Sequence, residues 1–255
     1  PTSQEVSPMS RGPNTLAVGA INDNNTPANF TLSGDFMGFQ KPEVSAVGTD
    51  IDLPQANMNV NGTSFSAPLV ASTIAALTRF NANLPFQPAR QKALAVAGAT
   101  NPVTNGARNG FGSLNADSYF FNPNSTSRNH SVGGARRVGW NAFDALDGNI
   151  NGIYRIPLQI SAASGSPVRV ALSVMRNPAD IWARRNTSFP MNANFDANVF
   201  DHNGAYIGGM YDIEDSTEIL EFNSNGSGVY RIEIERKSGS TTAEYELGVA
   251  ATWGF

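Results

Sequence analysis

The first 120 residues differ from the rest of the chain in how their apolar positions are arranged. Two short unbroken apolar runs, Thr15 to Ile21 and Val44 to Gly48, lie between turn-forming residues. Runs of this kind predict strands of a parallel sheet that is buried on both faces. Two helices are predicted over residues 64–80 and 88–97, the second with a proline in its first turn and Gly98 just past its end. The pattern indicates part of an α/β domain.

After residue 135 the pattern changes to strand-length segments, several of which alternate polar with apolar residues. Turn sequences such as Asn225-Gly226 and Ser238-Gly239 separate these segments, and their apolar residues do not recur at the spacing of a helix. The predicted strands are residues 153–160, 168–174, 197–200, 218–222, 229–234 and 245–250. The second half is therefore predicted to be an all-β antiparallel sandwich, similar to a jelly roll.

Between these two patterns lies a stretch rich in Asn, Ser, Pro and Gly, residues 121–135, which predicts a linker. The expected organisation is an α/β part over residues 1–120, the linker, and a β-sandwich domain over residues 136–255. A chain of this length is long enough for two domains of ordinary size.

Composition narrows the classes of function. Charged residues make up only 15% of the chain and the net charge is −4, so no basic surface for nucleic acid is predicted. The absence of cysteine excludes disulfide scaffolds, zinc fingers and thiol chemistry. No segment approaches the ~20 apolar residues that span a bilayer. A low-charge, Asn-rich composition is typical of secreted bacterial enzymes, so we expect a secreted, extracellular protein.

The main candidate for chemistry is the serine in Asn61-Gly62-Thr63-Ser64-Phe65-Ser66-Ala67-Pro68. Ser64 would stand at the N-terminus of a predicted helix, where the first backbone N–H groups have no partner inside the helix and can point at a developing oxyanion. Gly62 permits a close backbone approach in this turn, and Thr63 precedes the serine. The motif predicts a nucleophile; the alternative is an ordinary N-cap serine on a core helix.

Several ordered segments of the first half resemble the subtilisin-like serine peptidases (subtilases). Lys41-Pro42-Glu43-Val44-Ser45-Ala46-Val47-Gly48 is similar to the family's Lys-Pro-Asp-Val-x-Ala-Pro-Gly segment, and residues 61–68 are similar to its nucleophile motif. Gly110-Phe111-Gly112 looks like its closing loop. The resemblance covers roughly residues 10–118. It implies the last part of a parallel-sheet catalytic domain and a serine endopeptidase that hydrolyses protein or peptide substrates through an acyl-enzyme on Ser64.

The resemblance also implies that two members of the catalytic triad lie elsewhere, because the order along a subtilase chain is Asp, His, Ser. The sequence contains two histidines, His130 and His202, and both follow Ser64. One lies in the predicted linker and the other in a predicted hairpin turn, so we expect neither to serve as the base. The expected source of the His and Asp is an N-terminal catalytic half, as a second chain or an upstream segment. This chain alone is then expected to be inactive.

The second half resembles the pre-peptidase C-terminal class of β-sandwich, on the segments 198–204, 218–222 and 226–232. That resemblance implies a stabilising or substrate-presenting module that sometimes binds calcium. The expected chemistry requires no cofactor. Candidate ligands for a structural calcium are Asp144, Asp147, Asp212 and Asp215, which place several oxygens within short turns. Asx side chains bonded to their own backbone are the commoner explanation of such turns.

A second class of function stays open beside the peptidase. The missing His and Asp also fit a non-catalytic binding or structural protein in which a degenerate protease remnant carries the β-sandwich.

Overall fold

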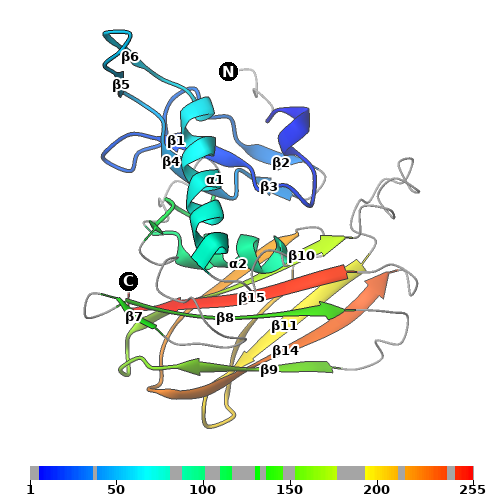
Figure 1. Cartoon of the computed structure of the whole chain (residues 1–255). Coiled ribbons are helices and arrows are strands. Elements are labelled where there is room, and N and C mark those ends of the chain that lie inside the picture. The colour runs from blue at the N-terminus through cyan, green and yellow to red at the C-terminus, as the bar shows by residue number, and fades with distance from the viewer. Residues whose placement is uncertain are drawn as a thin grey trace.

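Figure 1 shows the computed structural model of the chain. The structure describes residues 6–36, 39–80, 88–100, 110–116, 130–132, 136–145, 153–176, 193–211, 216–239 and 245–254. A part with two helices and a small parallel sheet comes first along the chain, and a two-sheet β-sandwich follows it. Within the described residues the chain is mostly β-sheet, with some α/β character in its first part.

The first part is built around a parallel pair of strands. Its elements are the 3-10 helix η1 (Pro8–Ser10), the strands β1 (Val18–Ile21), β2 (Gly34–Phe36), β3 (Phe39–Lys41), β4 (Val44–Val47), β5 (Ile51–Leu53) and β6 (Met58–Val60), and the helices α1 (Thr63–Phe80) and α2 (Pro88–Gly98). β1 and β4 pair in parallel, and α1 packs against both of them. The two predicted apolar strands and the two predicted helices are confirmed.

The second part consists of two antiparallel sheets. Its strands are β7 (His130–Val132), β8 (Arg136–Ala145), β9 (Ile153–Ile160), β10 (Pro167–Arg176), β11 (Ala193–Phe200), β12 (Tyr206–Met210), β13 (Thr217–Asn223), β14 (Gly228–Gly239) and β15 (Tyr245–Trp253). One sheet has the order β13-β10-β15-β8-β7 and the other β12-β11-β14-β9. All six predicted strands are present. β7, β8 and β12 are additional, and β7 occupies part of the predicted linker.

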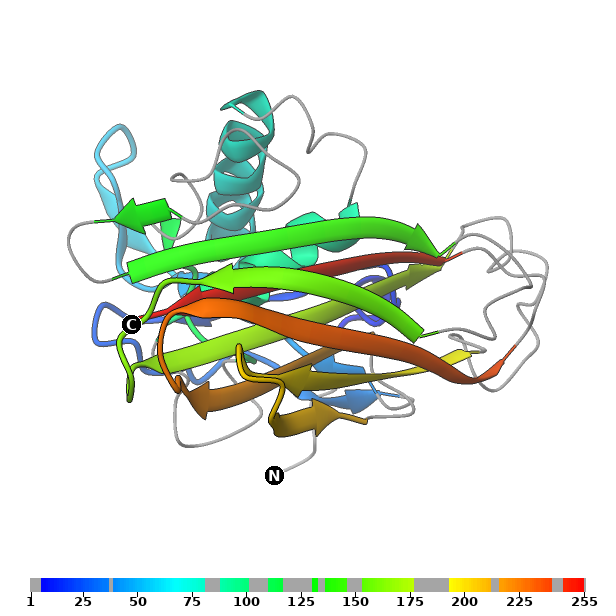
Figure 2. The same cartoon turned by 90° about the horizontal axis from the view of Figure 1, so that it is seen from below.

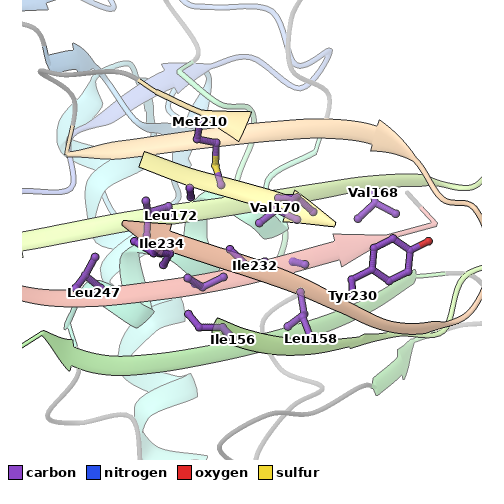
Figure 3. Packing of buried hydrophobic residues seen from close by; sticks show 14 of the residues in the cluster. Ile156, Leu158, Val168, Val170, Leu172, Met210, Tyr230, Ile232, Ile234 and Leu247 are labelled. Carbon is purple, nitrogen blue, oxygen red and sulfur yellow. The ribbon is translucent and has the colours of Figure 1, made fainter. Parts of the chain in front are cut away.

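The predicted antiparallel sandwich is present, whereas the finer jelly-roll description stays a prediction. So do the predicted domain boundaries, because residues 121–129 lie outside the described residues. Alternate residues of β9, β10, β11, β14 and β15 point between the two sheets and form an apolar core, in which Val170, Leu172, Ile232 and Leu247 meet (Figure 3). This alternation follows from the period of two in an extended strand.

A second apolar cluster joins the two parts of the chain. α2 lies against β15 and β10, on the face of that sheet which points away from the sandwich core (Figures 1 and 2). The sandwich residues at this contact are small: Ala171 and Ala250 share a cluster with the α2 residues Ala93 and Val96. Small side chains let the helix approach the sheet closely, so the two parts bury one continuous apolar surface.

A very close approach between the two parts lies at Gly248 of β15. A Cβ atom built on Gly248 would lie 2.4 Å from the backbone carbonyl carbon and oxygen of Ala89 in α2. No side chain fits in this space unless the helix moves. Gly248 is therefore required by packing and not by an unusual backbone conformation.

A buried ionic cluster also lies at this contact. The Glu43 carboxylate forms ion pairs with Lys41 and with Lys92, the latter at 2.7 Å, and its other oxygen accepts a hydrogen bond from the Ala17 N–H. Lys92 Nζ donates also to Ser216 Oγ of the sandwich, at 3.0 Å. All three charged side chains are at most 1% exposed. Charges this deeply buried are tolerated because each is paired and hydrogen-bonded.

The Gly248→Ala variant is expected to lose about 1–3 kcal/mol of unfolding free energy, the usual cost of overpacking a closely packed contact. Urea unfolding of the whole chain measures this loss. Gly34→Ala is the matched control, because a Cβ on Gly34 meets nothing within 4 Å. Equal stability of the two variants would contradict the packing requirement at Gly248.

The turn between β11 and β12 is held by one carboxylate. Asp201 Oδ1 accepts hydrogen bonds from the backbone N–H groups of Asn203, at 2.9 Å, and Ala205, at 2.8 Å. Its Oδ2 accepts one from Asn225 Nδ2, at 2.9 Å. The side-chain bond from Asn225 is the largest cause, followed by the backbone bonds, of a lowered pKa of Asp201. The charged form of this side chain stabilises the turn.

A lowered carboxyl pKa in the folded state gives stability that is present above the unfolded pKa, about 3.9, and lost as the pH falls through the folded value. We therefore expect the wild type to be more stable than Asp201→Asn at pH 7, and the difference to shrink below about pH 4. Urea unfolding of both proteins over a pH series measures it. A difference that does not change with pH would show that the charge of Asp201 is irrelevant to the turn.

Candidate functional site

Ser64 lies in the first turn of α1, directly after the β5–β6 hairpin. Its side chain is exposed, and within the described residues its hydroxyl has no hydrogen-bond partner. It therefore does not behave as a side-chain N-cap in this structure. An exposed hydroxyl at the start of an 18-residue helix is open to a partner or a substrate.

Backbone contacts to the end of β4 hold the turn that carries Ser64. The Gly62 N–H donates to the Gly48 carbonyl at 2.8 Å, and the buried Ser66 hydroxyl donates to the Val47 carbonyl at 3.2 Å. A Cβ on Gly48 would lie 2.2 Å from Ser66 Oγ and 2.9 Å from the Gly62 carbonyl oxygen. The glycine at position 48 thus allows the nucleophile turn to lie directly on the end of the sheet.

The helix supplies the electrostatics of the site. The first backbone N–H groups of α1, including that of Ser64, have no intrahelical acceptor, and the helix dipole makes this end positive. Pro68 lies inside α1 and has no N–H, so the Ser64 carbonyl lacks its usual helical donor four residues on. The arrangement can present a hydroxyl nucleophile beside donors that stabilise an oxyanion, which is what acyl transfer needs.

The structure brings the predicted motif residues Gly62, Thr63 and Ser64 into this one turn. Thr63 is the first residue of α1 and half-buried. Their roles as nucleophile and oxyanion motif stay predictions. The sequence predicted the motif, but it did not predict the hydrogen bonds that anchor the turn on Val47 and Gly48.

Neither histidine is shown beside Ser64. His202 is exposed in the turn between β11 and β12, where it lies against Gly228 and its ring is 5.8 Å from that of Tyr230. That turn is at the end of the sandwich far from the N-terminus of α1 (Figure 1). His130 belongs to β7, where its backbone pairs with Val138. In the part of the chain that the structure describes, no imidazole is brought to Ser64 as a base.

The calcium candidates remain untested. Asp147, Asp212 and Asp215 lie outside the described residues, and Asp144 is placed only by its backbone, opposite Glu246 in β15. Among the described side chains there is no group of three or more His, Cys, Asp or Glu residues that could hold a metal ion. Structural calcium stays a prediction from the sequence.

One face of α1 has no cover among the described residues. Val70 is 2% exposed and Ser66 is buried, whereas the adjacent Leu69 is 45% exposed. Ala67, Pro68, Ala71 and Ala75 are exposed beside it. An apolar helix face of this kind is normally packed against another element.

Comparison with known proteins shows that the turn carrying Ser64 lies in a region that matches a known protein family. Residues 1–113 match the model of the Subtilase family. These residues are therefore a subtilase-like region, which supports a serine protease of the subtilase kind and confirms that resemblance for this part of the chain. The resemblance of the sandwich to a pre-peptidase module stays a prediction. No curated protein matches the chain.

Among solved structures, the chain is similar to the self-cleaved protease domain of PatA, with 28% identity and a TM-score of 0.35. That similarity covers 44% of this chain and 42% of the other, so the chain spans less than half the length of that relative. A second similar structure is the acidic stable capsid structure of Helicobacter pylori bacteriophage KHP30, with 14% identity and a TM-score of 0.28; the similarity covers 50% of this chain and 92% of the other. A third is PliG, a periplasmic inhibitor of g-type lysozyme from Aeromonas hydrophila, with 17% identity and a TM-score of 0.25; it covers 48% of this chain and 88% of the other. TM-scores this low carry no argument about the fold.

No helix among the described residues combines the length and the apolar character that crossing a membrane requires.

The Gly48→Ala variant is expected to displace the turn of residues 61–66, because the added methyl group overlaps Ser66 Oγ and approaches the Gly62 carbonyl. The expected cost is about 1–3 kcal/mol of unfolding free energy. Urea unfolding measures the cost, and amide exchange at Gly62 reports whether its bond to Gly48 is weakened. Gly34→Ala again serves as control. Unchanged exchange at Gly62 would contradict the anchoring of this turn on Gly48.

Proposed function

We propose that the chain carries the nucleophile of a subtilisin-like serine endopeptidase, and that this nucleophile is Ser64. The observation that carries the proposal is the position of Ser64: exposed, at the N-terminus of α1, in a turn anchored on Gly48 within the subtilase-like region. The substrates are proteins or peptides. The low charge content of the sequence and its family resemblance support a secreted enzyme.

In the proposed reaction, Ser64 Oγ attacks the carbonyl carbon of the scissile peptide while a histidine base takes the hydroxyl proton. The tetrahedral oxyanion accepts a hydrogen bond from the Ser64 N–H at the positive end of α1. Collapse of this intermediate breaks the C–N bond, and the leaving amine takes the proton from the histidine. Water then hydrolyses the acyl-enzyme and frees Ser64. No cofactor takes part in these steps.

The proposal includes a histidine and an orienting aspartate contributed by a polypeptide outside residues 1–255, as an upstream segment or a second chain. The uncovered face of α1 supports such a partner, because Leu69 and the alanines beside it form an apolar surface next to Ser64. A polypeptide packed on this face would reach the N-terminus of α1 and could place its histidine beside the hydroxyl.

The test is to label the protein, purified from cells that express its whole coding sequence, with a fluorophosphonate. Ser64 Oγ attacks the phosphorus and fluoride leaves, so intact mass under denaturing conditions should show one phosphonyl adduct, on the fragment that contains Ser64. Ser64→Ala should abolish the adduct and lower kcat for peptide hydrolysis by several orders of magnitude, about 10⁶-fold on the scale seen in subtilisin.

Ser72→Ala is the matched control, because Ser72 is another exposed serine of α1 whose hydroxyl donates to the Leu69 carbonyl. It should label and hydrolyse like the wild type. An unlabelled wild type, with peptide hydrolysis absent or unaffected by Ser64→Ala, would refute the peptidase. It would favour the alternative, a non-catalytic binding or structural protein with a degenerate protease remnant, which the lack of an imidazole beside Ser64 in the described residues motivates.

A further inference from the structure

Helix α2 belongs to the subtilase-like region by sequence but is enclosed by the sandwich. All of its residues from Ala89 to Gly98 are buried except Gln91, including the charged Arg90 and Lys92. A surface helix of a separate domain would keep one polar face in water. The sandwich therefore completes the environment of this helix.

Charged residues of the sandwich stand at both ends of α2. At its N-terminus, Glu246 of β15 accepts a hydrogen bond from the Ala89 N–H at 2.9 Å. At its C-terminus, Arg169 of β10 donates from Nη1 to the carbonyls of Ala99, at 2.5 Å, and Val96, at 3.4 Å. An anion at the N-terminus and a cation at the C-terminus both complement the helix dipole and satisfy terminal backbone groups.

Arg169 reaches beyond the helix as well. Its Nη1 also donates to the Phe111 carbonyl, at 3.1 Å, and its Nε donates to Glu221 Oε1 on β13, at 2.7 Å. The Arg169 side chain is fully buried, while that of Glu221 is 44% exposed. The fork of donors on a guanidinium suits this position, because it binds several carbonyl oxygens and one carboxylate at once.

The segment that Arg169 holds is paired with β4. The Phe111 N–H donates to the Glu43 carbonyl at 2.8 Å, and the Ser45 N–H donates to the Gly112 carbonyl at 2.9 Å. The Leu114 N–H donates in turn to the Ser45 carbonyl at 2.7 Å. Residues 111–114 thus extend the parallel sheet by running beside β4.

β4 ends at the two residues that anchor the nucleophile turn, Val47 and the following Gly48. A continuous set of hydrogen bonds therefore leads from Arg169 through residues 111–114 to β4, and from Gly48 to Gly62, two residues before Ser64. Each contact is between main-chain groups or buried side chains, so a shift at one end is passed on by packing.

We propose that Arg169 is a positioning residue for Ser64: the sandwich, through this guanidinium, fixes β4 and with it the nucleophile turn. This inference rests on the proposed peptidase function. It assigns the sandwich a part in catalysis that does not depend on substrate or calcium binding.

The kinetic test compares Arg169→Met, Arg169→Lys and the wild type in the whole protein. We expect Arg169→Met to slow fluorophosphonate labelling of Ser64 and to lower kcat by about tenfold to a hundredfold, the scale of a misplacement of about 1 Å. KM should stay within about twofold, because the Arg169 side chain is fully buried and out of reach of a substrate. Arg169→Lys keeps the charge and some donors, so it should label faster than Arg169→Met.

Arg155→Met is the matched control. Arg155 pairs with Glu233 at 2.9 Å on the other sheet, and its side chain is 64% exposed. This variant should label like the wild type. All rates are taken below the unfolding temperature of each variant, so that loss of folded protein is not counted as slow chemistry.

Amide exchange gives a readout that does not need an active site. In Arg169→Met the amides of Phe111, Ser45 and Gly62 should exchange about tenfold faster than in the wild type, and in Arg155→Met they should not. If Arg169→Met does not fold, Arg169→Lys decides by the same two measurements.

The outcomes separate the two proposals. A folded Arg169 variant that labels at the wild-type rate, with unchanged exchange at Gly62, overturns the positioning inference and leaves the peptidase intact. A wild-type protein that is not labelled overturns the peptidase and with it any role in positioning, even where exchange shows that Arg169 and Gly62 are coupled. Slower labelling of Arg169→Met, together with faster exchange and an unaffected KM, supports the inference.

Discussion

The close contact between α2 and β15 is the constraint on which the rest of the structure depends. At Gly248 the backbone of the helix reaches the backbone of the strand, and no side chain separates them. Everything else at this contact is compatible with that approach: alanines in the shared cluster, a carboxylate at one end of the helix and a guanidinium at the other. Because this contact between two backbones leaves no space for a side chain, a residue larger than glycine at position 248 would displace the helix from the sheet.

Two parts that differ in sequence pattern thereby share one interior. The apolar cluster around α2 contains residues of β4, α1, β10 and β15, so removing either part would expose the apolar surface of the other. The buried ionic cluster of Glu43 and its lysines also joins the two parts, because Lys92 pairs with Glu43 and donates a hydrogen bond to Ser216 of the sandwich. Such a charged group needs every partner, because a buried ion that loses one is costly. The described residues of the two parts are therefore joined by a shared apolar cluster and a shared ionic cluster.

Sequence reasoning found the elements whose apolar pattern is strong. β1, β4, α1, α2 and six sandwich strands follow from runs and alternation, and the Ser64 turn follows from its motif. β12 was missed because Gly208 and Gly209 interrupt its pattern, and β8 because it begins with two arginines that suggest a solvated pair. Arg169 was missed for a different reason. The alternation of the strand places Arg169 on the outer face of β10. From the sequence alone this face is expected to be exposed to solvent, whereas in the structure α2 covers it. The available clue was the small residues at the other outer positions, Ala171, Gly248 and Ala250.

The exposed side of α1 has a practical meaning for work with the isolated polypeptide. Leu69 and the exposed alanines of α1 form an apolar surface that is unfavourable in water, on a helix in which only Ser66 and Val70 are fully buried among the described side chains. A preparation of residues 1–255 without any other polypeptide is expected to self-associate through this surface. An oligomer formed in this way would follow from the side of α1 that the described residues leave uncovered, and not from a symmetry that serves function.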